Sequence, residues 1–337
     1  MAPTHEGLRS NQWPLGCGTV PHDRRFRFAL SCSGTGIENG EQFTELARKA
    51  EALGYSTLFV PDHFVDHPLA PTVALTHAAA VTTTLRVGSF VLGNDYRHPV
   101  VLARDMATLD VLSEGRLELG IGAGWMTGDY EKAGMTLDRP GVRIARLSEA
   151  IAVLKGLFAP GPFTFDGEHY QVHDLDGAPE PVQQPIPFLI GGGGRKILGL
   201  AAREAQIVGV NANLRSGAGE SDDAVSTLTS AATDQKIAWL REAAGLHFDE
   251  LEIQTLVGFT HITTSADDAT PIIEGMAAHF KVTPDDARMS PVTLVGTEGQ
   301  IEELLEARRA RWQMSYVVVE STAVDAFAPL VARLAGK

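Results

Sequence analysis

Residues 86–125 read RVGSFVLGNDYRHPVVLARDMATLDVLSEGRLELGIGAGW and contain two strand-like runs on either side of a helix-like run. Arg86–Leu92 and Arg116–Leu119 have the length and apolar content of strands, and Val100–Leu112 has helical spacing. A strand, a helix and a second strand in this order predict a βαβ unit and therefore a parallel sheet. Glycine-rich Gly120–Trp125 follows the second strand. Since no Cβ stands in the way there, a flat, phosphate-bearing ligand can approach the backbone, which makes this loop a candidate cofactor site.

The bulk composition is that of a soluble globular protein. The chain has 337 residues, of which 44% are hydrophobic and 21% are charged. No uninterrupted apolar run reaches the roughly 20 residues needed to span a bilayer. The formal net charge is -14, and Lys and Arg form no cluster. We therefore expect neither membrane insertion nor nucleic-acid binding, because neutralising phosphates requires clustered cations.

The first 25 residues lack the apolar core of a signal peptide and predict a flexible tail before a single domain, residues 26–337. Cys17 and Cys32 are not a close pair, so we expect no disulfide framework. Such cysteine usage suits a reducing compartment and predicts a cytoplasmic location.

Eight apolar runs recur along the chain, and helical patterns follow them. The predicted strands are Phe26–Leu30, Thr57–Val60, Arg86–Leu92, Arg116–Gly120, Pro187–Ile190, Gln206–Val210, Glu252–Gly258 and Ser315–Glu320. The predicted helices are Gln42–Leu53, Pro71–Thr82, Val100–Leu112, Gly141–Phe158, Arg195–Ala205, Asp222–Ala243, Gln300–Arg311 and Ala323–Leu334. Eight strand-helix units predict an α/β fold, a (β/α)8 TIM barrel; an open doubly wound sheet is the alternative, which the strand count disfavours.

Two segments interrupt the alternation. The first insertion, residues 160–186, contains Phe163–Tyr170, which predicts a hairpin around Asp166-Gly167. The second insertion, residues 260–291, shows helical stretches and no strand pattern. Insertions that follow barrel strands often cover the carboxyl-terminal face, so we expect both to wall the substrate site.

Asp62 and His63 directly follow the second predicted strand, where side chains of a parallel barrel meet ligands. An imidazole there can move protons near neutral pH, and an adjacent carboxylate can orient it. The alternative is a histidine that only bonds to a neighbouring loop. Asp66 and His67 lie nearby, but Pro61 and Pro68 bracket the segment and oppose the helix that would align the two histidines, so we expect no metal site.

Two further loops carry candidate ligand contacts. Asn94 follows the third strand and can hydrogen-bond to a heterocycle edge, or it is a turn residue. Gly191, Gly192, Gly193, Gly194 and Arg195 follow the fifth predicted strand and precede a helix. This loop predicts a phosphate-binding site, because it combines close access to the backbone, the amino end of a helix and a guanidinium group. The alternative is a flexible turn. The sequence pattern of an ATP-type P-loop is absent.

The order of several motifs resembles that of the luciferase-like monooxygenase superfamily from about Phe26 to the carboxyl terminus. These motifs are Pro61–Phe64, Tyr96–Pro99, Leu109–Arg116, Gly120–Trp125 and Pro187–Gly193. Within that superfamily, the chain is most similar to a branch that uses the deazaflavin coenzyme F420. The motifs that carry this likeness are Val295–Thr297 with Gln300-Ile301, and Arg311–Val319.

The resemblance implies a (β/α)8 barrel that holds the deazaflavin ring at its carboxyl face. A non-proline cis peptide in the third strand would back the ring and fall at Phe90-Val91. Ala123, Gly124 and Asn94 would also lie near the cofactor, and the Gly191–Arg195 loop would meet its phosphate-bearing tail. The resemblance assigns His63 as the proton donor or acceptor, with Asp62 beside it.

Trp125 stands where members that oxidise glucose 6-phosphate have a catalytic Glu, so that activity is not expected here. Trp125 can instead stack on the ring, wall the substrate pocket with Phe64, or only pack. Apolar Phe64, Phe90, Trp125 and Phe188 favour a hydrophobic or conjugated substrate.

These features together predict an F420-dependent oxidoreductase that moves a hydride to or from a small organic substrate. The alternatives are an FMN-dependent monooxygenase of the same fold, a metal-dependent barrel hydrolase using Asp62, His63 and His67, and a barrel that binds a flavin without turnover. Family habit suggests a homodimer.

Overall fold

Parallel strands close into a barrel in the computed structural model, which describes residues 24–214, 224 and 226–337. The strands are β1 (Arg27–Ser31), β2 (Thr57–Val60), β3 (Arg86–Ser89), β4 (Leu92–Gly93), β5 (Leu117–Gly122), β8 (Phe188–Gly192), β9 (Ile207–Val210), β10 (Glu252–Val257) and β13 (Met314–Glu320). Their order is β3-β2-β1-β13-β10-β9-β8-β5-β4, and β3 also pairs with β5, which closes the ring. Since β4 continues β3, eight strand positions result. All eight predicted strands and the predicted barrel are confirmed.

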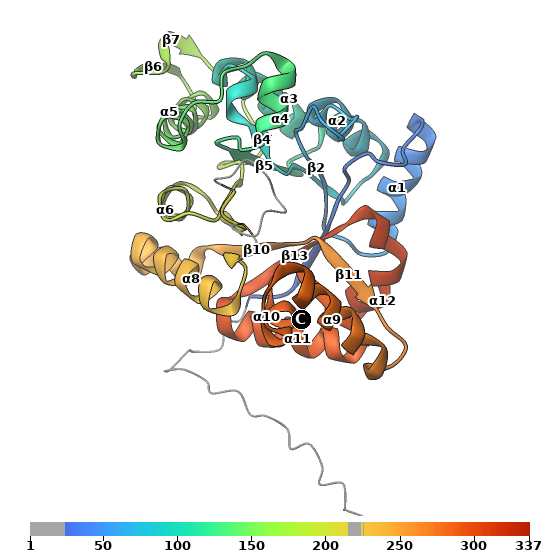
Figure 1. Ribbon diagram of the computed structural model, residues 1–337. Coiled ribbons are helices and arrows are strands. Elements are labelled where there is room, and N and C mark those ends of the chain that lie inside the picture. Colours follow the sequence, from blue (N-terminus) through green and yellow to red (C-terminus); the bar gives the residue numbers. More distant parts are fainter. Residues whose placement is uncertain (1–23, 215–223, 225) are drawn as a thin grey trace, which may run out of the picture.

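Helices surround the barrel, as Figure 1 shows. They are α1 (Gly40–Ala52), α2 (Pro71–Val81), α3 (Pro99–Leu112), α4 (Thr127–Ala133), α5 (Pro140–Phe158), α6 (Arg195–Glu204), α8 (Ser230–Ala244), α9 (Ala266–Phe280), α10 (Pro284–Met289), α11 (Glu298–Trp312) and α12 (Val324–Leu334). Proline begins α2, α3 and α5, where its missing N–H costs nothing. Thr297 and Gln300 form a capping box at the start of α11. The sequence did not predict α4.

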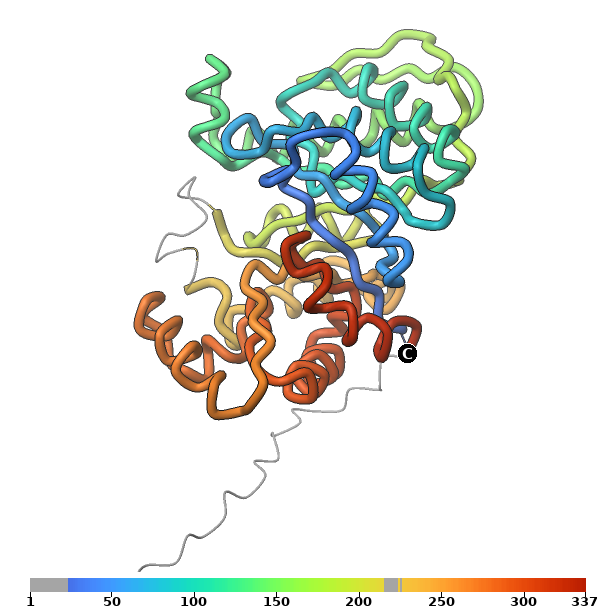
Figure 2. The backbone as a smooth tube through the Cα atoms, turned by 90° about the vertical axis from the view of Figure 1, so that its right-hand side faces the viewer, coloured from blue at the N-terminus to red at the C-terminus, as the bar shows by residue number. Residues whose placement is uncertain are grey.

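The described chain ends where it begins, at the amino-terminal end of the barrel. The N–H of Phe26 donates to the carbonyl oxygen of Lys337 at 2.9 Å, and the start of the blue tube lies beside the C-terminus in Figure 2. Most of the predicted tail, residues 1–23, lies outside the described residues, as do Cys17 and the start of the helix predicted from Asp222. Cys32 is a buried free thiol. None of the helices in the described ranges combines the length and the apolar character needed to cross a membrane.

The first insertion forms the predicted hairpin but does not wall the cavity described below. Strands β6 (Pro162–Asp166) and β7 (Gln171–Asp176) pair antiparallel. The carboxylate of Glu149 on α5 accepts hydrogen bonds from the N–H groups of Glu168, His169 and Tyr170. The hairpin thus packs on the outside of α5, and no residue of 160–186 lines the cavity. The expected wall role is wrong because the insertion follows a helix, whose end lies at the amino-terminal end of the barrel.

The second insertion carries strand structure that the sequence analysis missed. Strand β11 (Phe259–Ile262) pairs in parallel with β12 (Thr293–Gly296), and α9 and α10 lie between them in sequence. The expectation of no strand is wrong, because β11 is only four residues long and carries few apolar residues. The buried guanidinium of Arg308 donates to the carbonyl oxygens of Ser290 and Thr293, which fastens this insertion to α11. Unlike the hairpin, the second insertion supplies residues to the cavity wall.

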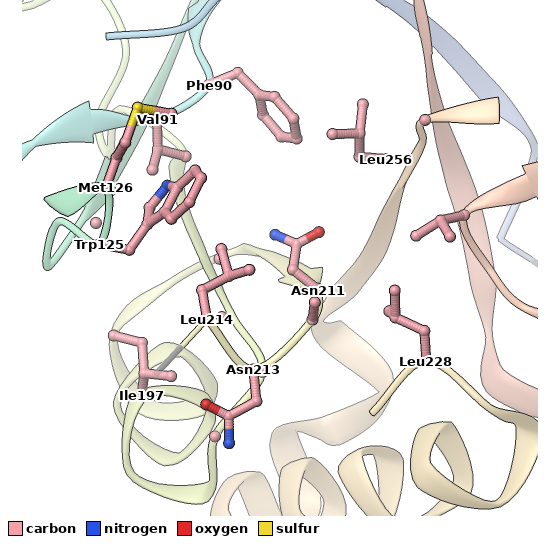
Figure 3. Close-up of a pocket in the computed structure, with 18 of the residues that line it drawn as sticks. Phe90, Val91, Trp125, Met126, Ile197, Asn211, Asn213, Leu214, Leu228 and Leu256 are labelled. Carbon is pink, nitrogen blue, oxygen red and sulfur yellow. The ribbon is translucent and has the colours of Figure 1, made fainter. Parts of the chain in front are cut away.

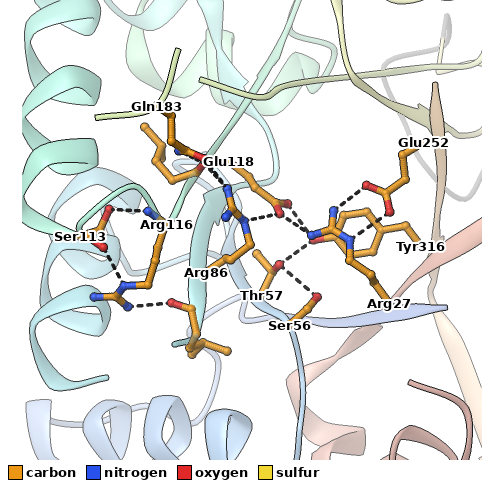
Figure 4. Close-up of polar contacts among 12 residues, drawn as sticks. Arg27, Ser56, Thr57, Arg86, Ser113, Arg116, Glu118, Gln183, Glu252 and Tyr316 are labelled. Carbon is orange, nitrogen blue, oxygen red and sulfur yellow. Dashed lines mark hydrogen bonds and ion pairs between the residues drawn. The ribbon is translucent and has the colours of Figure 1, made fainter. Parts of the chain in front are cut away.

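Charged side chains fill the barrel near its amino-terminal end (Figure 4). Arg27 donates to Glu118 at 2.7 Å and to Glu252 at 2.6 Å. Arg86 also donates to Glu118, and the hydroxyl of Tyr316 donates to the other oxygen of that carboxylate, both at 2.8 Å. Because these side chains occupy the amino-terminal interior, ligand access is left to the carboxyl-terminal end.

Candidate active site

A cavity of about 1300 Å³ opens at the carboxyl ends of the strands. Most residues that the sequence analysis assigned to ligands line it: Asp62, His63, Phe90, Val91, Ala123, Gly124, Trp125, Gly191, Gly192, Gly193, Gly194 and Arg195. Figure 3 shows Phe90, Val91 and Trp125 among its apolar side chains, with the amides of Asn211 and Asn213. The carboxyl-end rule therefore places the site in the expected part of the fold.

His63 is held by a carboxylate that is distant in sequence. Its Nδ1 lies 2.6 Å from Oδ2 of Asp129, which is fully buried in α4. The other oxygen of Asp129 accepts the N–H groups of Phe64 at 2.9 Å and Val65 at 3.0 Å. The hydroxyl of Tyr96 donates to Oδ2 at 3.1 Å. These contacts fix the loop after β2 and the orientation of the imidazole ring.

The electrostatics of Asp129 determine which nitrogen of His63 carries the hydrogen. Burial alone raises the pKa of Asp129, but hydrogen bonds from His63 and from the N–H groups of Phe64 and Val65 outweigh it, so the pKa is lowered. The carboxylate is therefore ionised and accepts a hydrogen from Nδ1 of His63. Nε2 is left for a ligand, since His63 lines the cavity.

Asp62 does not orient His63, which corrects the sequence interpretation. Its carboxylate receives both Nη atoms of Arg97, at 2.7 and 3.0 Å, and the N–H of Gly93 at 2.9 Å. Adjacent residues of an extended segment point in different directions, so the neighbour in sequence is not the partner in space. Asp62 connects the loop after β2 to the segment after β4.

Phe90 and Val91, which follow β3 and lie beside β5, contribute apolar side chains to the cavity wall. The Phe90-Val91 peptide is cis, as the resemblance implies. A Cβ added to Gly122 would lie 2.8 Å from Val91 Cγ2, so glycine at this position lets the Val91 side chain pack against β5. Arg143 donates to the carbonyl oxygens of Ala123, at 3.1 Å, and Gly124, which holds the loop that follows β5.

The glycine loop after β8 leads into the amino end of α6. Gly194 is the N-cap and offers no side-chain hydrogen bond to the free N–H groups. A Cβ on Gly193 would lie 2.2 Å from the carbonyl oxygen of Ala212, so the fold itself requires glycine there. Arg195 borders the cavity but pairs with Glu242 at 2.7 Å on the surface. This loop provides backbone donors with an adjacent cation.

Three expected contacts lie elsewhere. Asn94 is buried in a 3-10 turn, and its Nδ2 donates to the hydroxyl of Tyr170 at 3.2 Å, outside the cavity lining. Phe64 is exposed and its ring packs on Tyr96, with centroids 4.6 Å apart. Phe188 is buried in the core beside Phe158. Asn94 and Phe64 are thus wrong as direct cavity contacts, because local turns direct their side chains away.

Trp125 and His67 complete the wall around His63. The rings of Trp125 and His63 meet edge to face with centroids 5.5 Å apart. The ring of His67 lies 5.0 Å from that of His63, and its Nδ1 lies 2.9 Å from the carbonyl oxygen of Val65. Within residues 24–214, 224 and 226–337, no three His, Cys, Asp or Glu side chains are grouped to hold a metal ion.

Several polar residues of the site were not expected from the sequence, among them Asp129, Asn211, Asn213 and Glu320. Asn211 and Asn213 follow β9, and Glu320 ends β13. The carboxyl-end rule, applied to these strands, would have found these three. Asp129 gives no such signal because it lies in a short helix beyond the strand end.

Comparison with known proteins assigns the family. Residues 26–249 match the family model described as luciferase-like monooxygenase, and the chain belongs to this family. An uncharacterized protein of Mycobacterium tuberculosis is 31% identical over 269 residues, which cover 72% of this chain and 88% of that protein. An F420-dependent glucose-6-phosphate dehydrogenase of Kineococcus radiotolerans is 34% identical over 177 residues, which cover 49% of this chain and 52% of the dehydrogenase. The match to that enzyme thus spans about half of its length.

Solved structures support the fold. The coenzyme F420-dependent tetrahydromethanopterin reductase of Methanopyrus kandleri superposes with a TM-score of 0.72 at 18% identity, covering 93% of this chain and 99% of the reductase. A riboflavin lyase solved with modified FMN gives a TM-score of 0.71 at 12% identity, covering 93% of each chain. At these identities the likeness concerns the fold alone.

Proposed function

We propose that this protein is an oxidoreductase that uses coenzyme F420 and exchanges a hydride with a small organic substrate. One observation carries the proposal: the cavity brings the imidazole of His63, held through Nδ1 by Asp129, together with the apolar side chains of Phe90 and Val91 and with the glycine loop. The relative from Kineococcus, named as F420-dependent, supports the choice of cofactor.

The residues present fit a deazaflavin. Phe90 and Val91 would contact the ring, because both line the cavity with apolar side chains. The amides of Asn211 and Asn213 can bond to polar edges. The N–H groups at the amino end of α6 would bind the phosphate-bearing tail, since an anion is favoured at a helix amino end. When bound, the deazaflavin supplies a two-electron hydride carrier.

His63 would carry the proton in the reaction. With Nδ1–H donated to Asp129, neutral His63 accepts a hydroxyl proton at Nε2 during oxidation of an alcohol. In the reverse direction, protonated Nε2 donates to the developing oxyanion of a carbonyl substrate. In either direction Asp129 keeps the Nδ1 side of the ring hydrogen-bonded, so the proton is exchanged at Nε2.

The cavity wall favours an apolar substrate. Several apolar side chains line the cavity, among them Leu256, Phe259, Met276, Phe280 and Val282, and the last three of these come from the second insertion. These side chains exclude water from the reacting atoms and reward burial of hydrophobic surface.

The second candidate is an FMN-dependent monooxygenase. Two observations favour it: the family model is described as luciferase-like monooxygenase, and the riboflavin lyase of this fold was solved with modified FMN. The test is a titration of the full-length protein with F420 and with FMN, followed by cofactor fluorescence. We expect F420 to bind at least about tenfold more tightly, a difference of about 1.4 kcal/mol. Spectral change with FMN alone would contradict the proposal.

A His63→Ala variant tests turnover separately from binding. The F420-loaded variant should lose oxidation of a panel of alcohols while its F420 affinity stays within about threefold of the parent. Unchanged activity would instead support a barrel that binds the cofactor without using His63. The homodimer and the cytoplasmic location remain predictions.

A further inference from the structure

Glu320 occupies a distinct place in the cavity wall. It is the last residue of β13, stands in register with Ser31 on β1, and lines the cavity together with His63 and His67. Glu320 ends β13, Ser31 ends β1, and the two histidines follow β2; these three strands are neighbours in the barrel. The glycine loop lies on β8, with β10 and β9 between it and β13. Glu320 therefore faces the part of the cavity that the substrate, rather than the cofactor tail, would fill.

The carboxylate of Glu320 has no hydrogen bond or ion pair within the part of the chain that the structure describes. Two other carboxylates line the described part of the wall, and both are occupied. Asp62 is bound by Arg97 and Gly93, and Asp286 accepts the hydroxyl of Thr283 at 2.8 Å. The acceptor atoms of Glu320 thus remain available to a molecule in the cavity.

The charges of the wall are separated by strand. The lining cations Arg143, Arg195 and Lys196 come from α5 and α6. Among the described lining residues, none from β1, β2, β10, β13 or the second insertion is Lys or Arg. Burial raises the pKa of Glu320, and nearby His67 opposes this shift. Within the described residues, His67 acts on Glu320 as a charged neighbour, and an imidazole does not provide a permanent positive charge.

We propose that Glu320 determines substrate class: its carboxyl group hydrogen-bonds to a hydroxyl of an uncharged, largely apolar substrate and excludes molecules that carry a carboxylate or a phosphate. This inference rests on the proposed function, since it names the substrate of the same site. A neutral hydroxyl can donate to a free carboxylate oxygen. An anion in the same place would be repelled and would lose its hydration without gaining a cation.

Two probes with the same carbon skeleton test the inference, cyclohexylmethanol and cyclohexanecarboxylate. Their dissociation constants for the full-length protein are measured at pH 7.5 by ligand-observed NMR, first without cofactor and then with F420. We expect the alcohol to bind at least tenfold more tightly than the carboxylate. In the Glu320→Gln and Glu320→Ala variants, the ratio of the carboxylate's dissociation constant to that of the alcohol should fall to threefold or less. Glu303→Gln removes the same charge from the exposed face of α11 and should keep the parent ratio.

Three results would overturn the inference: a ratio that both Glu320 variants preserve, a carboxylate that binds the parent as well as the alcohol does, or no binding of either probe. The cofactor titration is read separately. If F420 does not bind but the ratio still collapses in the variants, the proposed function fails while Glu320 keeps its role in selecting ligands. If F420 binds and the ratio is unchanged, only the role of Glu320 is lost.

Discussion

Nδ1 of His63 and Oδ2 of Asp129 lie 2.6 Å apart although the two residues are 66 positions apart in sequence. The loop after β2 supplies the histidine and α4 supplies the carboxylate, so closure of the barrel creates the pair. Asp129 does not line the cavity, but it contacts the imidazole that does.

Asp129→Asn should impair turnover without impairing cofactor binding. An asparagine amide can donate to Nδ1, which would move the hydrogen of neutral His63 to Nε2 and block proton acceptance there. We expect kcat to fall by about 100-fold or more. The F420 dissociation constant should stay within about threefold of the parent value, because Asp129 lies behind the cavity wall.

Stopped-flow absorbance of F420 gives the rate of turnover. The matched control is Asp105→Asn, on the exposed face of α3. Turnover within threefold of the parent would show that Asp129 is only structural.

Arg97→Met alone should destabilise the protein more than Arg97→Met combined with Asp62→Asn. The single change leaves the buried carboxylate of Asp62 without its cation, which costs about 3–5 kcal/mol of unfolding free energy. The double change removes the unpaired charge as well, so we expect it to recover about half of this loss. Urea unfolding followed by circular dichroism measures both. If Asp62→Asn fails to improve the Arg97→Met protein, the ion pair is not what holds the loop after β2.

The barrel could be predicted from the sequence because its strands are short, apolar and separated by helices of ordinary length. The site could be predicted only where ligand-facing residues directly follow a strand, as His63 and Gly191–Arg195 do. The contact between Asp129 and His63 could not be predicted, because tertiary packing rather than sequence spacing brings the two residues together. Asn94 also follows a strand, but a 3-10 turn directs its amide toward Tyr170, and no residue pattern distinguishes the two cases.

Gly193→Ala and Gly194→Ala should separate folding from cofactor binding in the same loop. A Cβ at 193 would lie 2.2 Å from the backbone oxygen of Ala212, whereas a Cβ at 194 would be 3.9 Å from Asn213 Nδ2. We expect Gly193→Ala to lower the free energy of unfolding by about 1–3 kcal/mol.

Gly194→Ala should leave stability within about 0.5 kcal/mol but weaken F420 binding, because its methyl group narrows the proposed approach of the phosphate-bearing tail. Thermal unfolding and the fluorescence titration measure the two effects. Equal F420 affinity in Gly194→Ala and the parent would place the tail away from this loop.

Glu118→Gln should make the protein less stable at neutral pH and less sensitive to acid. Burial alone raises the pKa of Glu118, but the charges of Arg27 and Arg86 outweigh it, so the pKa in the folded state is lowered. A lowered folded pKa means that the ionised carboxylate stabilises the fold at pH values above its unfolded pKa, about 4.3. This contribution disappears as the pH falls through the folded value.

Removing the charge of Glu118 leaves two partly buried guanidinium groups without their shared anion, which should cost about 3–5 kcal/mol at pH 7. Urea unfolding from pH 7 to pH 3 should show the difference between parent and variant shrinking at the acidic end. Glu303→Gln, on the outside of α11, should show no such convergence. A difference that stays constant over this range would mean that the carboxylate of Glu118 stabilises the barrel by packing rather than by its charge.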